Sequence, residues 1–293
     1  MIDNLQKQDS REFISHGTLY TFETEMVPYP DHRRRTIRVW LPEEYDGTRR
    51  FPVIYMHDGQ SVFRGPDGRR ALEADRVLTE LSAEGISAIV VAIDTARTRG
   101  TELTPPYPKV KMERVINGIR LPMELEESTT DLYAAFIINH LKPMIDAEFA
   151  TLTDPLNTCV GGCSAGGSAS YYLFLHYPEV FGKAIVNSPG LPMFHQEALM
   201  EELENYDYSK LEGHRICFYN GDQAIDASSL YDVIDVYRKL REKGLDATQN
   251  MVLVDSRQTH YEAAWARYLP EMLRFLFAED NRAEMPPPRP PRQ

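Results

Sequence analysis

The stretch VGGCSAGG, residues 160–167, places Ser164 in a G-x-S-x-G frame between an apolar strand and the start of a helix. Residues 157–160 have the pattern of a strand end, and residues 168–176 that of a helix. This frame is a nucleophile elbow, a turn so sharp that glycines are needed where a Cβ would meet neighbouring backbone. A merely flexible glycine-rich turn is the alternative, and the flanking strand and helix argue against it. The sequence therefore predicts that Ser164 presents its hydroxyl as a nucleophile.

A serine hydroxyl is a weak nucleophile at neutral pH, so the elbow predicts a histidine base and an orienting carboxylate, in the chain order serine, acid, histidine. His260 fits the base, because it follows the strand-like residues 251–255 and opens the amphipathic run 261–277. The other histidines lie in helical patterns, in polar stretches, in a loop or ahead of the serine. We therefore predict His260 as the general base.

The acid has two candidates, Asp222 and Asp226, in the loop that follows the strand-like residues 215–220. Asp226 has the better spacing to the helical residues 230–243, whereas Asp222 lies closer to the end of the strand. Either could have an ordinary structural role, Asp226 as a helix cap and Asp222 as a turn residue. The sequence favours Asp226 and leaves Asp222 open.

An oxyanion hole needs two backbone N–H groups that face the developing negative charge. The residue after the nucleophile, Ala165, supplies one. The turn after the early strand-like residues 51–57 supplies the other, and Gln60 is the predicted donor. His57 and Asp58 precede the serine and so fall outside the expected order. They are predicted to brace the oxyanion loop by hydrogen bonds.

Four sequence blocks occur along the chain in the order YMHDGQSVF at 55–63, GCSAGG at 162–167, FGKAIVNSP at 181–189 and HYEAAW at 260–265. Together they resemble the putative esterase family of α/β-hydrolases. That family includes enterochelin esterases, carbohydrate acetyl and feruloyl esterases, and mycolyltransferases. The resemblance extends from about residue 35 to about residue 277.

The resemblance implies an α/β-hydrolase fold and a metal-independent serine hydrolase, with Ser164 as nucleophile and His260 as base. One departure concerns the acid loop. Many relatives read G-T-x-E there, and Ala224 stands at the position of the glutamate.

The rest of the chain predicts an α/β fold, because strand-like apolar runs alternate with helical patterns. The central runs are apolar without a period of two, which is typical of strands buried on both faces. We therefore expect a mostly parallel central sheet with helices on both faces. The expected strands are 35–41, 51–56, 87–93, 157–161, 183–187, 215–219 and 251–254, and the expected helices 71–84, 130–148, 168–177, 230–243 and 262–277.

We expect one domain over residues 1–280, followed by a Pro/Arg-rich tail at 281–293. Residues 95–128 lie outside the alternation of strands and helices and are rich in charge and proline. A long irregular segment inside a compact domain usually has a role. We expect it to act as a lid or substrate-binding loop.

Composition excludes several functional classes. The net charge of −12 argues against a nucleic-acid surface, and no apolar run is long enough to span a membrane. The first residues lack the features of a secretion signal, so a cytoplasmic protein with three reduced cysteines is expected. We find neither the Cys/His spacing of a metal site nor a phosphate-binding glycine loop, so we expect no metal and no cofactor. The oligomeric state, a homo-oligomer included, stays open.

Together these features predict a serine esterase that hydrolyses a small-molecule ester through an acyl-enzyme. Two alternatives remain. An acyltransferase would pass the acyl group to an alcohol instead of water, and a pseudo-hydrolase would keep the fold as a binding protein with weak catalysis.

Overall fold

The structure, a computed structural model, describes residues 2–8, 13–64, 71–116, 119–123 and 126–278. The expected tail at 281–293 lies outside this part of the chain.

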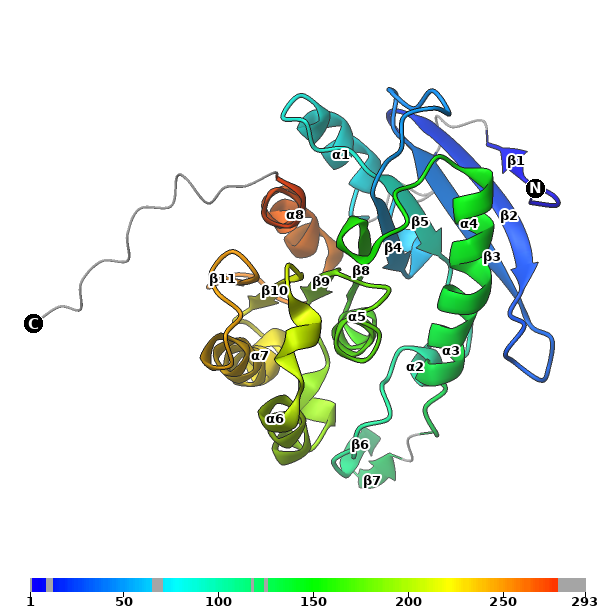
Figure 1. The fold of residues 1–293 in the computed structure, drawn as a ribbon. Helices are drawn as coiled ribbons and strands as arrows, with labels where there is room; N and C mark the ends of the chain where they lie inside the picture. Colours follow the sequence, from blue (N-terminus) through cyan, green and yellow to red (C-terminus); the bar gives the residue numbers. More distant parts are fainter. Residues whose placement is uncertain (1, 9–12, 65–70, 117–118, 124–125, 279–293) are drawn as a thin grey trace, which may run out of the picture.

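The centre of the molecule is a nine-stranded sheet in the order β1-β2-β3-β5-β4-β8-β9-β10-β11 (Figure 1). The pairs from β1 to β5 are antiparallel, and those from β5 to β11 are parallel. The strands are β1 (Gln6–Lys7), β2 (Thr18–Glu25), β3 (Arg34–Leu41), β4 (Val53–His57), β5 (Ile89–Ile93), β8 (Thr158–Cys163), β9 (Lys183–Asn187), β10 (Arg215–Gly221) and β11 (Asn250–Asp255).

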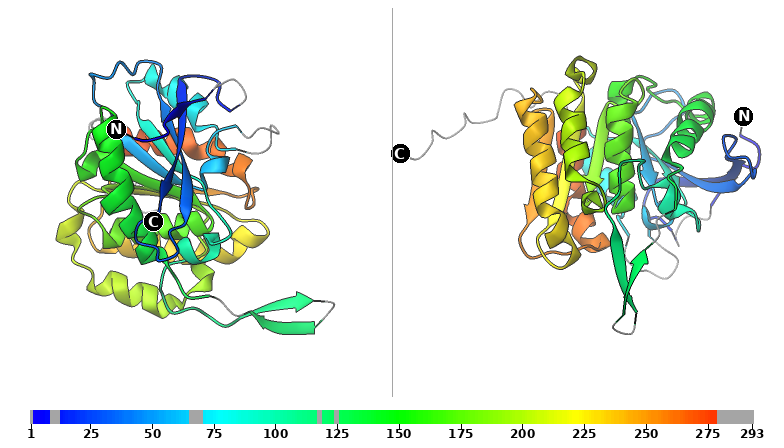
Figure 2. Two further views of the ribbon diagram at one scale, coloured as in Figure 1. Left: turned by 90° about the vertical axis from the view of Figure 1, so that its right-hand side faces the viewer. Right: turned by 90° about the horizontal axis from the view of Figure 1, so that it is seen from below.

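Helices cover both faces of this sheet and form two separate apolar cores (Figure 2). The helices α1 (Ala74–Ser82) and α8 (Glu262–Phe277) pack together over one face. The other face is covered by α3 (Thr130–Phe136), π-helical η3 (Ile137–Leu141), α4 (Lys142–Glu148), α5 (Ala165–His176), α6 (Gln196–Asn205) and α7 (Ile225–Glu242). All residues of β4 and β5 are buried, as expected for strands enclosed by both layers.

The order of the strands identifies where a ligand site belongs. From β4 the chain continues to its neighbour β5 on one side, whereas β8, β9, β10 and β11 follow one another on the other side. In open parallel sheets, ligands bind beyond the carboxyl ends of the strands at such a switch point. The crevice between the ends of β4 and β8 is therefore the expected position, and those ends carry His57 and Cys163.

The structure confirms the α/β-hydrolase class and the predicted alternation of strands and helices. It adds elements that the sequence did not indicate, chiefly strand β2, next to the edge strand β1, and helix α6. The segment 95–128 is less irregular than expected. It contains α2 (Arg99–Glu102) and a hairpin of β6 (Met112–Ile116) and β7 (Ile119–Met123), which extends away from the sheet (Figure 2).

A buried ion pair fastens the start of this segment to the sheet. Glu102 is fully buried, and both of its carboxylate oxygens accept from Arg35, which is 3% exposed, at 2.8 and 3.0 Å. Arg33 and the Thr98 hydroxyl also donate to Glu102. These four donated hydrogen bonds offset the cost of burying the charges. The compensation is lost if either Glu102 or Arg35 is removed.

We predict that Glu102→Ala lowers the free energy of unfolding by about 3–5 kcal/mol, because it leaves the Arg35 guanidinium buried without its counter-ion. Urea denaturation measures the change. The matched control is Glu84→Ala, which breaks an ion pair to Arg274 in which both side chains are 46% exposed. The control should change stability far less, since exposed pairs are screened by water. Equal losses in the two variants would contradict a special role for the buried pair.

Candidate active site

The nucleophile elbow forms where β8 passes into α5. Ser164 has φ 59° and ψ −125°, a conformation that L-residues rarely adopt, and its N–H donates to Asn187 O at 2.9 Å. A Cβ on Gly162 would lie 2.7 Å from the Gly166 carbonyl carbon, and one on Gly167 would lie 2.6 Å from Asn187 O. The glycines in the motif are therefore required by close backbone approach, as the sequence predicted.

The structure brings His260 and Asp226 together. His260 Nδ1 donates to Asp226 Oδ1 at 2.7 Å, and Asp226 is 1% exposed. The other carboxylate oxygen of Asp226 accepts from Ser188 Oγ at 2.9 Å and from Gly221 N–H at 3.1 Å. A carboxylate held by three donors cannot rotate freely. It fixes the orientation of the imidazole and places its proton on Nδ1, which leaves Nε2 as the acceptor.

A second contact supports this pair from helix α8. Trp265 Nε1 donates to Ser188 Oγ at 2.9 Å, and Ser188 in turn donates to Asp226. The Trp265 ring also packs nearly perpendicular to His260, with centroids 5.0 Å apart. One tryptophan therefore supports both His260 and, through Ser188, Asp226. Nothing in the sequence pattern alone indicated Ser188.

Asp222 lies elsewhere in the same loop. Its Oδ1 accepts from the side chain of Gln223 at 2.6 Å, and the structure places no contact between Asp222 and His260 within the described residues. The loop makes a sharp strand-to-helix turn, with Ala224 at φ 51° and ψ −124°, close to the angles of Ser164. Helix α7 begins after this turn, and Asp226 in its first turn lies against the end of β10, where it accepts from the Gly221 N–H.

The loop after β4, which is the predicted oxyanion loop, is braced by the segment that follows β5. Asp58 has φ 55°, and its carboxylate accepts from Arg99 Nε at 2.6 Å, Arg99 NH2 at 2.8 Å and Thr95 Oγ1 at 2.9 Å. Thr95 also exchanges two hydrogen bonds with the Gln60 side chain. Asp58 thus braces this loop as expected, through partners that the sequence did not reveal.

The two predicted oxyanion donors lie in the first turns of two helices. Gln60 lies in the short 3₁₀ helix η2 (Gly59–Ser61), and Ala165 is the first residue of α5. The first N–H groups of a helix have no acceptor within it. At the start of α5 the helix dipole also favours negative charge. Both positions can therefore offer an N–H to an anion.

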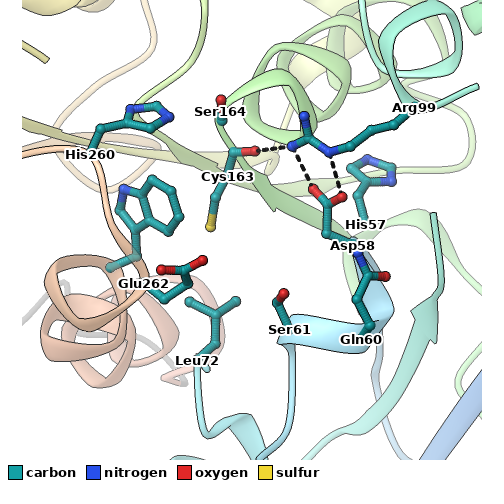
Figure 3. Close-up of a pocket in the computed structure, with 11 residues that line it drawn as sticks. His57, Asp58, Gln60, Ser61, Leu72, Arg99, Cys163, Ser164, His260 and Glu262 are labelled. Carbon is teal, nitrogen blue, oxygen red and sulfur yellow. Dashed lines mark hydrogen bonds and ion pairs between the residues drawn. The ribbon is translucent and has the colours of Figure 1, made fainter. Parts of the chain in front are cut away.

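These residues surround a pocket of about 330 Å³ at the ends of β4 and β8 (Figure 3). Ser164 and His260 both line it, and the imidazole extends toward the serine. The structure records no hydrogen bond between these two described residues. In unliganded enzymes this contact is often long and tightens when substrate binds. The lining residues are His57, Asp58, Gln60, Ser61, Leu72, Arg99, Cys163, Ser164, His260, Glu262 and Trp265.

Two further groups at the pocket are held neutral. Burial raises the pKa of the Cys163 thiol far above its usual range, so the thiol stays protonated beside Ser164. Burial lowers the pKa of His57 to about 4, and its Nδ1 lies within hydrogen-bond distance, 2.9 Å, of the Tyr133 hydroxyl. Neither group contributes charge to the pocket at neutral pH.

Among the residues that the structure describes, no three His, Cys, Asp or Glu side chains are grouped as metal ligands would be. In the same part of the chain, no helix combines the length and the apolar character that a membrane span requires.

Comparison with known proteins identifies the family. The chain matches the family described as Putative esterase over residues 31–276, most of its length, and belongs to that family. Membership supports ester hydrolysis as the general activity.

Two relatives come from Bacillus subtilis. YjcH is 29% identical over 154 residues, which cover 53% of this chain and 55% of YjcH, so the match spans about half of that relative. YbbA is 21% identical over 260 residues, covering 84% of this chain and 94% of YbbA.

Similar solved structures include a ferulic acid esterase, with a TM-score of 0.63 and 15% identity over 88% of this chain and 98% of that one. The ferric enterobactin esterase of Salmonella typhimurium has a TM-score of 0.63 and 17% identity over 87% of this chain and 57% of that one. At these identities the likeness shows the shared fold.

The buried His57 predicts how stability changes with pH. Its pKa of about 4 in the folded chain lies below the value of about 6.5 expected after unfolding. Between these values the unfolded chain binds the proton, so stability falls as pH falls from 6.5 to 4, by about 3 kcal/mol. We predict that His57→Asn, whose amide can keep the Tyr133 contact, loses this part of the pH dependence. Urea denaturation at several pH values would give parallel curves for the two proteins if His57 were not responsible.

Proposed function

We propose that the protein is a serine esterase that hydrolyses a carboxylic ester of a small molecule through an acyl-enzyme. The observation that carries this proposal is the 2.7 Å hydrogen bond between His260 Nδ1 and the buried Asp226, at a pocket also lined by Ser164 on its strained turn. These are the three groups of a nucleophile, base and orienting acid, in the chain order of α/β-hydrolases.

In this mechanism Ser164 Oγ attacks the ester carbonyl carbon while His260 Nε2 takes the hydroxyl proton. The carbonyl oxygen becomes negative and is stabilised by the N–H groups of Gln60 and Ala165. The imidazolium, stabilised by Asp226, then returns the proton to the leaving alcohol as the C–O bond breaks. Water, deprotonated by the same imidazole, then attacks the acyl-enzyme. The imidazolium returns that proton to Ser164 Oγ as the acyl C–O bond breaks, which releases the acid and restores the free enzyme. All of these steps use groups of the chain itself.

The family and the solved structures add support at a coarser level. Relatives of this fold include proteins named as esterases of ferulic acid and of ferric enterobactin. From these names we take only ester hydrolysis as the reaction class. A pocket of about 330 Å³ lies at the lower end of the usual range for small-molecule sites, which favours a compact ester or one end of a longer ester.

The nucleophile is tested by labelling with a fluorophosphonate probe and by hydrolysis of p-nitrophenyl acetate. We expect the probe to add to Ser164, as located by peptide mass spectrometry, and Ser164→Ala to lose both labelling and hydrolysis. The loss in kcat should be on the order of 10⁶ for complete removal of the nucleophile. Ser61→Ala, which removes another hydroxyl from the same pocket, should still be labelled. Labelling that persists in Ser164→Ala would assign the nucleophile to another residue.

The acid is tested by a matched pair of substitutions in one loop. We expect Asp226→Asn to lower kcat by about 10⁴, because an amide cannot hold the imidazole with its proton on Nδ1. Asp222→Asn should cost less than about tenfold, since asparagine replaces aspartate well in turns. Steady-state kinetics with p-nitrophenyl acetate measures both, and circular dichroism verifies that each variant is folded. The reverse ranking would assign the role to Asp222.

A further inference from the structure

Glu262 lines the pocket and has no part in the proposed mechanism. It is the first residue of α8, two positions after His260. Figure 3 shows its carboxylate directed into the space between Cys163 and Leu72. Among the residues that the structure describes, no hydrogen bond or ion pair involves this carboxylate. Its charge also acts on the Cys163 thiol, whose pKa is raised first by burial and further by nearby Asp58 and Glu262.

The other charges of the pocket are already matched. Asp58 and Arg99 form a two-point ion pair at 2.6 and 2.8 Å, and Thr95 donates a third hydrogen bond to Asp58. Arg99 also points an N–H toward the Cys163 carbonyl oxygen, at 3.5 Å. The guanidinium is therefore already paired within the loop, and among the described lining residues the negative charge of Glu262 is left unmatched.

The net charge of the whole chain is also negative. The chain carries a net charge of −12, and a cleft lined by one sign of charge concentrates counter-ions of the other sign. A cation in the pocket would gain a charge-assisted hydrogen bond or a close ion pair, whereas an anion would face an unmatched carboxylate. A neutral group of the same shape would gain neither effect.

We infer that Glu262 makes this site selective for esters that carry a positive charge, an ammonium group a few bonds from the ester carbonyl. This inference rests on the proposed function and narrows its substrate class. Glu262 is a specificity-determining residue, which touches the remote part of the substrate and takes no proton from the reacting atoms. Anionic esters of the same size are the substrates that the site disfavours.

The experiment compares esters that differ only in charge. On the acyl side, the probes are the p-nitrophenyl esters of γ-trimethylammoniobutyric acid, of its carbon isostere with a tert-butyl group, and of glutaric acid. On the alcohol side, they are acetylcholine and the acetate in which a tert-butyl group replaces the trimethylammonium. Each kcat/KM is divided by the rate of hydroxide-catalysed hydrolysis of that ester, which removes differences in intrinsic reactivity.

We expect the cationic ester to exceed its neutral isostere by about tenfold on at least one side, and the glutarate ester to fall below the isostere. Glu262→Gln should bring these ratios close to one. Raising NaCl from about 20 mM to about 500 mM should reduce the preference of the wild type, since a partly exposed charge is screened. Ratios within one enzyme preparation do not depend on how much of the variant is folded.

Glu271→Gln is the matched control, because Glu271 is an exposed carboxylate on the same helix and does not line the pocket. It should keep the wild-type ratios. The inference is overturned if the wild type shows no charge preference on either side, or if Glu262→Gln keeps the preference. Failure of the proposed function looks different, because then none of the esters is hydrolysed through Ser164.

Discussion

Close backbone packing at the elbow is the constraint on which the site depends. Ser164 can stand at the end of β8 only because Gly162 and Gly167 let the chain approach Gly166 and Asn187 without a Cβ between them. The strain in the serine backbone persists because β8 and α5 are fixed on both sides by the parallel sheet and its core. The same turn sets the positions of the Ser164 hydroxyl and of the Ala165 N–H, so the proposed nucleophile and the proposed oxyanion donor cannot move independently.

Asp226 has a comparable role on the other side of the pocket. Its carboxylate joins β10 through Gly221, the turn after β9 through Ser188, and the loop before α8 through His260. Burial makes such a carboxylate costly unless every contact is made. The arrangement is therefore stable in one geometry, which is the geometry that orients the imidazole. Trp265 extends this coupling into α8, so the helix that carries Glu262 is held in the same network.

The sequence predicted what depends on local pattern. The elbow, the alternation of strands and helices and the placement of His260 all follow from short-range spacing of glycine, apolar and polar residues. From the sequence, Asp226 and Asp222 could only be ranked. The turn at Ala224 decides which of them reaches His260, and it goes with the contact between Asp226 and the end of β10, which local pattern does not reveal. Arg99, Thr95 and Ser188 were missed for the same reason. Each contacts its partner in the site across 37 or more positions of sequence, and their residue types are common on protein surfaces.

Backbone groups and side chains have different electrostatic roles in the proposed site. Arg99 is matched by Asp58, and burial keeps His57 and Cys163 neutral, so among the described lining residues no unmatched positive side chain stands beside Ser164. In the proposed mechanism, stabilisation of the oxyanion then falls to backbone N–H groups, whose dipoles are fixed in place and need no reorganisation as charge develops. A positive side chain there would bind carboxylate products as tightly as the transition state. With Arg99 neutralised in this way, the proposed role of Glu262 is to act on the remote end of the substrate alone, and the proposed recognition and chemistry use separate groups.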